Sequence, residues 1–263
     1  MYPFNYHRPT SVRQASTLLG KTDEARLLAG GHSLLPMMKQ RLSAPSDIVD
    51  LGLVEGLRGI EIKGRTLHVG AMMTHAEVAA SDIVKQEIPA LAELVGSIGD
   101  PHVRHRGTIG GSVANNDPNA DYPAACLALN ATIVTNKRRI DADDFFVDMF
   151  ETALQQGEII TKVLFPVPRR AGYAKFRNPA SRYPLVGVFV AKRGGEVRAA
   201  VTGAGPCVFR SKEIEEALNG RFAAKSLDGV TVPADGLNSD IHGSAEYRAH
   251  LIVVMAKRAA DAA

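Results

Sequence analysis

Pro166 and Pro168 stand close together about two thirds of the way along the chain, directly before Arg169 and Arg170. Because proline lacks a backbone N–H and fixes its own φ, neither a central strand nor a helix can continue through this segment. The sequence therefore predicts an α+β protein in two parts: a larger N-terminal domain, residues 1–166, and a smaller C-terminal domain, residues 169–263. Both parts have the usual size of a domain.

Apolar periodicity and glycine turns predict the elements of each part. Thr10 is expected to cap a helix that ends at Gly20, the segment 57–69 is expected to form a hairpin, and the basic segment 100–107 reads as a loop. Further helices are expected at about 34–42, 75–80, 84–98, 124–129, 213–218 and 246–260, and strands at 25–29, 47–51, 132–134, 185–190 and 197–201.

Composition excludes several classes of protein. The 263 residues carry 31 Lys and Arg against 28 Asp and Glu, a net charge of +3, and 45% of them are hydrophobic, as in an ordinary globular protein. Two cysteines, Cys126 and Cys207, are too few for a disulfide-rich scaffold, and no CxxC motif is present to hold zinc or an iron–sulfur cluster. Basic residues are scattered and tryptophan is absent, so nucleic-acid binding is not expected.

The sequence shows no targeting or membrane signal. The N-terminal MYPFNYHRPT lacks the apolar core of a secretion signal, and nowhere are about 18 consecutive residues apolar. We therefore expect a cytoplasmic protein without a transmembrane segment. Cys126 lies in an apolar helical run and is expected to be a buried thiol.

A glycine pair separates a strand from a helix at Ala29-Gly30-Gly31-His32-Ser33. Glycines let backbone N–H groups approach an anion closely, and a helix N-terminus favours negative charge. Ser33 could cap the helix or bind a phosphate oxygen. An ordinary strand-to-helix turn has the same composition, so this motif alone leaves both interpretations open. Neither Walker nor Rossmann spacing occurs.

A second glycine pair lies in Thr108-Ile109-Gly110-Gly111-Ser112, shortly after Arg104 and Arg106. Two such loops could clamp one pyrophosphate from both sides, because its charge requires several donors at close approach. A dinucleotide is then the natural ligand. The pair of loops is far more specific than either loop alone.

The segment from Asn115 to Asp121 is either a polar turn or a set of hydrogen-bonding groups for ribose and adenine. His102 and His105 have the spacing HxxH but lack a third ligand, so no metal site is expected. No nucleophile motif is present and no catalytic residue is assigned. A binding chain without its own acid–base groups indicates that the ligand carries the chemistry.

Four segments in this order, LAGGHSLLPMMKQRL, RHRGTIGGSVANNDPNADYPA, GEIITKVLFPVP and KFRNPASRYPLVGV, identify a family. With them the chain resembles, over nearly its whole length, the FAD-binding medium subunit of the molybdenum hydroxylases, the group that contains carbon monoxide dehydrogenase and xanthine dehydrogenase. The resemblance implies an oxidoreductase subunit whose FAD-binding domain has two α/β subdomains, divided near 53–57. A smaller C-terminal domain with an antiparallel sheet and helices would follow.

The same resemblance implies partners. A small subunit would carry two [2Fe–2S] clusters, and a large subunit would carry the molybdenum cofactor and oxidise the substrate. Electrons would pass through the clusters to FAD and on to an external acceptor. Such subunits would assemble as a dimer of heterotrimers, and this chain itself would hold only FAD.

Residues are assigned to the cofactor from the resemblance. Pyrophosphate would be held by Ala29, Gly30, Gly31, His32, Ser33, Thr108, Gly110, Gly111 and Ser112, with Leu27 and Leu34 flanking the first loop and Asn115 following the second. Asp121 would bind the adenosine ribose side, and Ile160 would pack on the cofactor. Arg177 would place a positive charge near the flavin, and Tyr183 would place an aromatic ring beside it. Ser112 departs from the pattern of the family, in which this position is often Asn.

Two other functions remain open from the residues themselves. One is a self-contained FAD-dependent oxidase, which would need a substrate pocket and a convergent acid or base. The other is a non-catalytic nucleotide-binding assembly module that keeps the loops without the flavin. The colour of the purified protein separates the assembly module from the flavoprotein subunit and the oxidase, because a flavoprotein is yellow.

Overall fold

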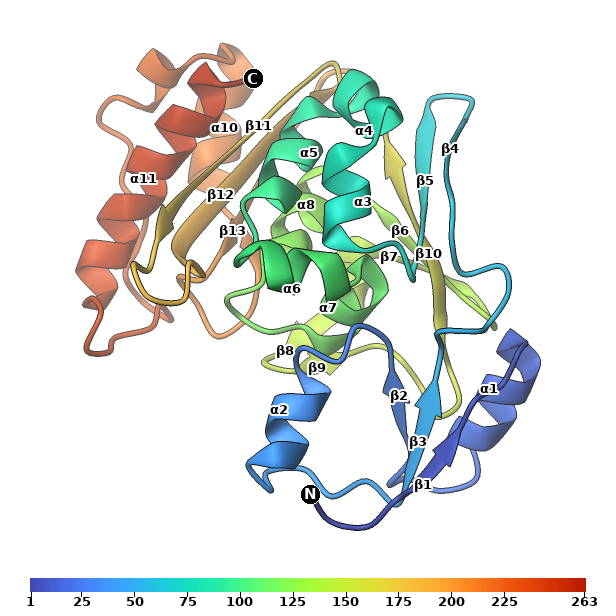
Figure 1. Ribbon diagram of the computed structural model, residues 1–263. Coiled ribbons are helices and arrows are strands. Elements are labelled where there is room, and N and C mark those ends of the chain that lie inside the picture. Colours follow the sequence, from blue (N-terminus) through green and yellow to red (C-terminus); the bar gives the residue numbers. More distant parts are fainter.

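A small parallel sheet organises the first fifty residues of the structure, a computed structural model that describes residues 1–263 (Figure 1). Its strand order is β1 (Asn5–His7), β3 (Asp47–Asp50) and β2 (Arg26–Leu28). Helices α1 (Val12–Leu19) and α2 (Leu34–Lys39) make the two crossovers. The cap expected at Thr10 is wrong by one residue: helix α1 starts at Val12, and the Ser11 hydroxyl accepts a hydrogen bond from the Gln14 amide.

A five-stranded antiparallel sheet follows, in the order β4 (Ile60–Lys63), β5 (Thr66–Gly70), β10 (Ile160–Pro166), β6 (Thr132–Thr135) and β7 (Arg139–Asp141). The hairpin expected at 57–69 is confirmed as β4 and β5. Strand β10 joins the centre of the sheet from far along the chain and ends at Pro166, which pairs with Thr66. The two prolines therefore end this strand, as the sequence predicts.

Six helices lie between this sheet and the C-terminal part of the chain (Figure 1): α3 (His75–Ala80), α4 (Asp82–Glu87), α5 (Pro89–Gly96), α6 (Pro101–Arg106), α7 (Ile109–Asn115) and α8 (Tyr122–Ala128). The loop expected at 100–107 is wrong, because α6 occupies it. Asp100 caps the helix by accepting from the Val103 amide at 3.0 Å, and Pro101 follows in the first turn. Short α9 (Ala142–Phe145) leads into the hairpin of β8 (Phe146–Asp148) and β9 (Glu151–Thr152).

The C-terminal part is a four-stranded antiparallel sheet with helices on its outer face, as expected. Its order is β11 (Arg170–Arg177), β12 (Pro184–Arg193), β13 (Glu196–Thr202) and β14 (Phe209–Arg210). Helix α10 (Lys212–Gly220), a 3₁₀ turn η1 (Ala224–Leu227) and helix α11 (Ala245–Asp261) complete the chain, and α11 packs along β11 and β12.

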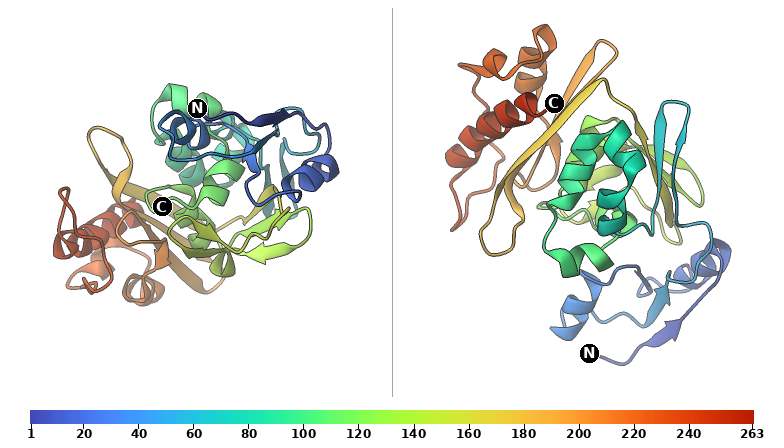
Figure 2. Two further views of the ribbon diagram at one scale, coloured as in Figure 1. Left: turned by 90° about the horizontal axis from the view of Figure 1, so that it is seen from below. Right: turned by 45° about the horizontal axis from the view of Figure 1, so that its top comes forward.

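Both faces of β12 are buried, and they belong to different cores. Val188 and Val190 pack toward α10 and α11, whereas Phe189 and Ala191 join the largest apolar cluster, to which α5 and α8 contribute. The C-terminal sheet is therefore a layer between two groups of helices (Figure 2). No helix has the length and apolar character needed to cross a membrane.

Candidate functional site

A cavity of about 460 Å³ lies where the first glycine loop faces helices α6 and α7. That volume is typical of a ligand site. Its wall contains every residue assigned above except one: Leu27, Ala29, Gly30, Gly31, His32, Ser33, Leu34, Thr108, Gly110, Gly111, Ser112, Asn115, Asp121, Ile160 and Tyr183. Two motifs separated by about seventy residues in the sequence thus form one site, and tertiary folding alone brings them together.

The first loop presents a run of free backbone donors to this cavity. Gly31 has φ +78°, a left-handed conformation that reverses the chain between β2 and α2. None of the amides from Gly30 to Leu34 donates to an acceptor within the protein. The Ser33 side chain makes no capping hydrogen bond to α2. Consecutive unpaired N–H groups form a concave nest for an anion, so the structure favours the anion-binding interpretation of this loop.

The second loop differs, because its amides are already used. Those of Gly110, Gly111 and Ser112 donate to the Ala71 carbonyl, the Thr108 hydroxyl and the Thr108 carbonyl. Gly110 packs so closely on Ala71 that a Cβ would lie 2.6 Å from the Ala71 Cβ. This loop therefore offers its Ser112 hydroxyl rather than backbone donors, while Gly110 serves packing.

The two loops touch at Gly30. A Cβ on Gly30 would lie 2.1 Å from the Arg106 carbonyl oxygen and 2.8 Å from the Gly107 Cα. Only glycine permits this approach of backbone to backbone. On Gly111, by contrast, a Cβ would meet only the Thr108 hydroxyl at 3.0 Å and the Ala29 Cβ at 3.8 Å. A side chain at Gly111 would therefore enter the space between the loops.

Asp121 joins the cavity wall to the C-terminal sheet. One oxygen of its carboxylate accepts from the Tyr173 hydroxyl at 2.6 Å and from the Lys175 ammonium at 2.8 Å. Burial raises the pKa of Asp121, although the Lys175 charge opposes this shift. Burial likewise lowers the pKa of Lys175, and Asp121 opposes that shift. The second carboxylate oxygen makes no hydrogen bond within the protein and is available to a ligand.

Arg177 is the one assigned residue outside the cavity wall. It lies at the exposed end of β11, two residues beyond Lys175 on the same face of the strand. Tyr183, at the start of the following strand, does line the cavity and keeps 47% of its surface exposed. The connection between β11 and β12 thus forms the open rim of the site.

His75 is a wall residue that the sequence analysis did not assign. It lies at the first position of α3, its amide donates to the Gly107 carbonyl at 2.9 Å, and its Nδ1 is buried without a partner. Burial, together with the charges of His32 and Arg104, lowers the pKa of His75 to about 4. The imidazole is therefore neutral at neutral pH. The capping box of Thr74 and Glu77 marks this helix start in the sequence.

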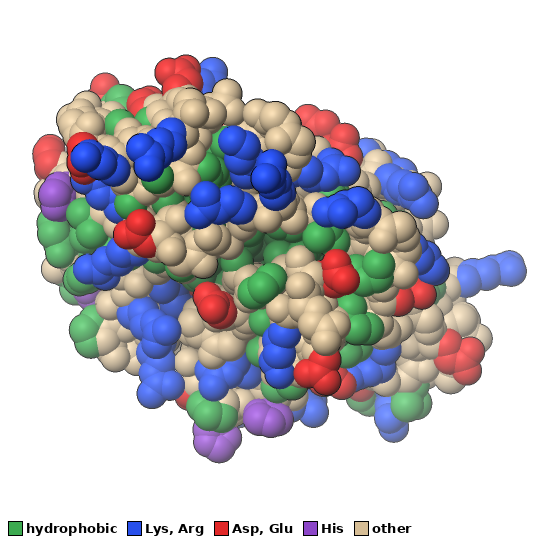
Figure 3. Space-filling view, turned by 90° about the horizontal axis from the view of Figure 1, so that it is seen from above, with side chains coloured by type: hydrophobic (Ala, Val, Ile, Leu, Met, Phe, Trp, Pro, Cys, Tyr) green, Lys and Arg blue, Asp and Glu red, His purple; other side chains and the backbone are tan.

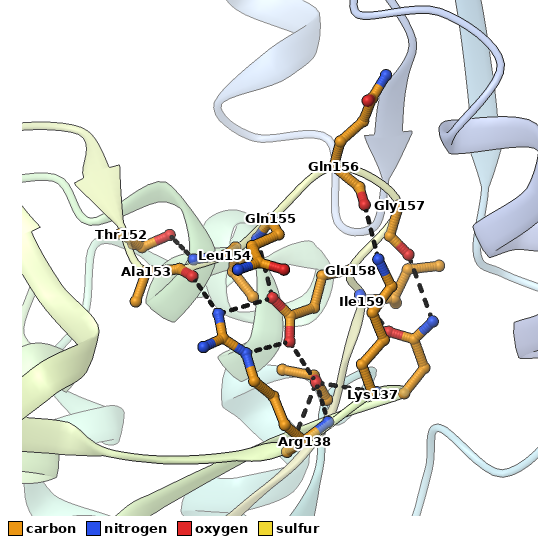
Figure 4. A network of polar contacts seen from close by, with 12 residues as sticks. Lys137, Arg138, Thr152, Ala153, Leu154, Gln155, Gln156, Gly157, Glu158 and Ile159 are labelled. Carbon is orange, nitrogen blue, oxygen red and sulfur yellow. Dashed lines mark hydrogen bonds and ion pairs between the residues drawn. The ribbon is translucent and has the colours of Figure 1, made fainter.

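A buried carboxylate fixes another part of the wall, the segment 154–160 (Figure 4). Glu158 accepts from Arg138 at 3.0 Å, from the Thr135 hydroxyl at 2.7 Å and from the Gln155 amide at 2.9 Å. Burial alone would raise the pKa of Glu158, but these donors outweigh it and lower the pKa. Since Ile159 and Ile160 follow Glu158 in the chain, this network holds the apolar side chains of the segment in the cavity. No sequence spacing indicates this pairing, because Arg138 lies on another strand connection.

Metal-ligating side chains do not gather in the structure: no group of three or more His, Cys, Asp or Glu is placed to hold an ion. Cys126 is fully buried, as expected, and burial raises the pKa of its thiol. The site is thus an anion cradle with apolar walls and a tyrosine at its rim. Such an arrangement suits a ligand that has both phosphate groups and apolar rings.

Comparison with known proteins defines the family. The model of the FAD binding domain in molybdopterin dehydrogenase matches residues 2–168. The nicotine 6-hydroxylase medium subunit of Paenarthrobacter nicotinovorans is 38% identical, over 96% of this chain and 94% of that one. The carbon monoxide dehydrogenase medium chain of Hydrogenophaga pseudoflava is 35% identical, over 99% of this chain and 96% of that one.

Solved structures agree. A chain of carbon monoxide dehydrogenase from Hydrogenophaga pseudoflava superposes with a TM-score of 0.89 at 36% identity, covering 100% of this chain and 98% of the other. A chain of quinoline 2-oxidoreductase from Pseudomonas putida 86 gives a TM-score of 0.89 at 30% identity, with the same coverage. The protein belongs to the family of FAD-binding medium subunits of molybdenum hydroxylases. It is an oxidoreductase subunit, and FAD is its cofactor.

Proposed function

We propose that this chain is the electron-transfer flavoprotein subunit of a molybdenum-containing hydroxylase. When bound, FAD would take up electrons from [2Fe–2S] clusters on a partner subunit and pass them to an external acceptor. The observation that carries this proposal is the run of free amides from Gly30 to Leu34, which faces the cavity. The two phosphates of FAD need several such donors at close approach.

The remaining groups of the wall have complementary roles. The Ser112 and Thr108 hydroxyls and the Asn115 amide, which line the cavity, would bind the adenosine diphosphate part, and the free oxygen of Asp121 would accept from a ribose hydroxyl. Ile160 would pack on the cofactor. Tyr183 would lie beside the isoalloxazine ring and limit its contact with water, and Arg177 would lend positive charge to that end of the site.

Domain organisation follows the same scheme. Residues 1–166 would form the FAD-binding domain in two subdomains, divided near 53–57, and residues 169–263 the C-terminal flavoprotein domain. Support comes from the three larger sheets, which use residues 5–50, 60–166 and 170–210 in turn. The core shared between α8 and β12 would keep the C-terminal domain docked over the flavin site.

Partners are proposed from the relatives, which are named as medium chains or subunits of larger enzymes. A large subunit would hold the molybdenum cofactor and choose the substrate, and a small subunit would hold the [2Fe–2S] clusters. We propose a dimer of such heterotrimers in the cytoplasm.

An absorption spectrum of the purified chain, with and without added FAD and before and after anaerobic reduction, tests this function. We expect a bound flavin that bleaches on reduction, with no iron–sulfur absorbance. The chain alone should not oxidise an organic substrate, and such activity would indicate a self-contained oxidase instead. Failure of the complete complex to contain or take up FAD would refute the flavoprotein function and favour a non-catalytic nucleotide-binding module.

A further inference from the structure

A cleft of about 570 Å³ at the end of the molecule that carries the C-terminus is lined by four cations, Arg169, Arg170, Lys192 and Arg221. We call these four residues the basic cleft. Figure 3 looks onto this end and shows Lys and Arg side chains gathered in a band with few acidic side chains among them. The one acidic residue in the lining is Asp261.

Backbone pairing forces these cations together. The Arg169 amide donates to the Lys192 carbonyl at 2.8 Å, and Arg170 lies opposite Lys192 in the β11–β12 ladder. Arg221 is brought in by its neighbour Phe222, whose carbonyl accepts from Arg170 at 3.0 Å. The Arg170 guanidinium also lies 4.8 Å from the centre of the Phe222 ring. The cleft is therefore held in shape by its own backbone and by Arg170.

None of the four cations has an ion-pair partner. Three other cations of the C-terminal part are paired: Arg210 with Glu215 at 2.7 Å, Arg248 with Asp240 at 2.7 Å, and Arg198 with Asp143. Like charges that face each other across a ladder destabilise the folded chain. With Asp261 as the one acidic residue in its lining, the cleft keeps an excess of positive charge, which an anionic surface would complement.

The position of the cleft limits which partner can meet it. Arg170 begins β11 and Arg177 ends it, so the cleft lies roughly 23 Å along the strand from the Tyr183 rim. A partner that exchanges electrons with the flavin must approach that rim. A partner bound at the basic cleft lies at the other end of the sheet, and the word "medium" in the relatives' names implies a larger chain beside this one.

We propose that the basic cleft docks an acidic segment of the large subunit of the complex, an inference that rests on the function proposed above. Carboxylates of that segment pair with Arg169, Lys192 and Arg221, while Arg170 stays engaged with Phe222 and keeps the cleft open. Because the cleft is exposed, the attraction is screened by salt. Association of the subunits therefore weakens as ionic strength rises.

The test uses the whole complex, purified through a tag on this chain, with molybdenum, iron and FAD measured per chain. The variant is Arg169→Glu with Lys192→Glu. The matched control is Arg13→Glu with Lys21→Glu, two exposed cations on and just after α1, at the other end of the molecule. At low ionic strength we expect the variant to bind the molybdenum-containing subunit about tenfold more weakly than the parent, and the control to bind within about twofold of it.

Three results decide the matter. Equal association of variant and parent, with FAD present in both, would overturn the docking proposal. Binding of inorganic pyrophosphate to the chain alone through Arg169 and Lys192, with subunit association unchanged, would also overturn it. The cleft would then be a phosphate site. Absence of FAD from the parent complex would overturn the proposed function itself. The molybdenum content tests only whether the large subunit is bound, so the two failures can be told apart.

Discussion

Lys175 and Asp121 form an ion pair of 2.8 Å in which both side chains are almost completely buried, at 3% and 2% exposure. Asp121 precedes α8 and lines the cavity, whereas Lys175 lies on the C-terminal sheet. This pair therefore ties the sheet to the wall of the cavity. Tyr173 adds a second hydrogen bond to the same carboxylate oxygen.

Asp121→Asn should destabilise the protein by about 3 kcal/mol, because it leaves the Lys175 charge buried without its counter-charge. The free energy of unfolding in urea measures this. The control is Asp82→Asn, whose partner Lys85 lies 3.8 Å away in an exposed pair, and it should leave the unfolding midpoint unchanged. Equal midpoints for the parent and Asp121→Asn would contradict the structural role of the pair.

His75 should make the fold acid-sensitive. Its pKa is about 4 in the folded protein against 6.5 in the unfolded chain, so the unfolded state binds the proton more readily as pH falls. Stability from this residue is present above pH 6.5 and is lost as pH falls toward 4. Between pH 7 and pH 5 the loss is about 2 kcal/mol.

Urea unfolding of the parent and of His75→Gln at both pH values measures this contribution. We expect the variant to lose about 2 kcal/mol less than the parent on acidification. The same exchange at the exposed His250 should leave the parent's pH dependence intact. Parallel pH profiles for His75→Gln and the parent would refute the assignment.

Gly111→Asp should abolish FAD retention. The new Cβ points between the two glycine loops, 3.8 Å from the Ala29 Cβ, so the carboxylate would repel a pyrophosphate bound there. The ratio of flavin to protein absorbance measures retention, and far-ultraviolet circular dichroism confirms folding. Gly220→Asp, where a Cβ meets nothing within 4 Å, is the matched control and should retain FAD. A folded Gly111→Asp protein with full flavin content would disprove the pyrophosphate position.

Tyr183→Ala should leave FAD bound and expose its ring. Tyr183 contributes to the cavity rim but is half exposed, so its loss removes a cover without removing phosphate donors. Iodide quenching of flavin fluorescence should increase, and the rate of flavin reoxidation should change. Tyr2→Ala, at an equally exposed tyrosine, should alter neither. Unchanged quenching in Tyr183→Ala would place the tyrosine away from the ring.

Local sequence signals predicted the elements well where glycine, proline and apolar spacing agree. Helices near 75–80, 213–218 and 246–260 are present, as are the strands on either side of Gly194. The helix at 101–106 was missed because its basic composition suggested a loop, whereas Asp100 and Pro101 supply its cap and first turn. A cap of two residues decided the conformation there.

The sequence by itself determined the two glycine loops, the end of the central strand at Pro166 and the family, since each depends on residue types at fixed local spacing. Only the tertiary structure decided which donors are free. In the folded chain the amides of the second loop donate to Ala71 and Thr108, whereas those from Gly30 to Leu34 have no partner. His75 and Glu158 complete the wall of the cavity. Hydrogen-bond partners and burial join residues far apart in the chain, and no local pattern records which of them meet.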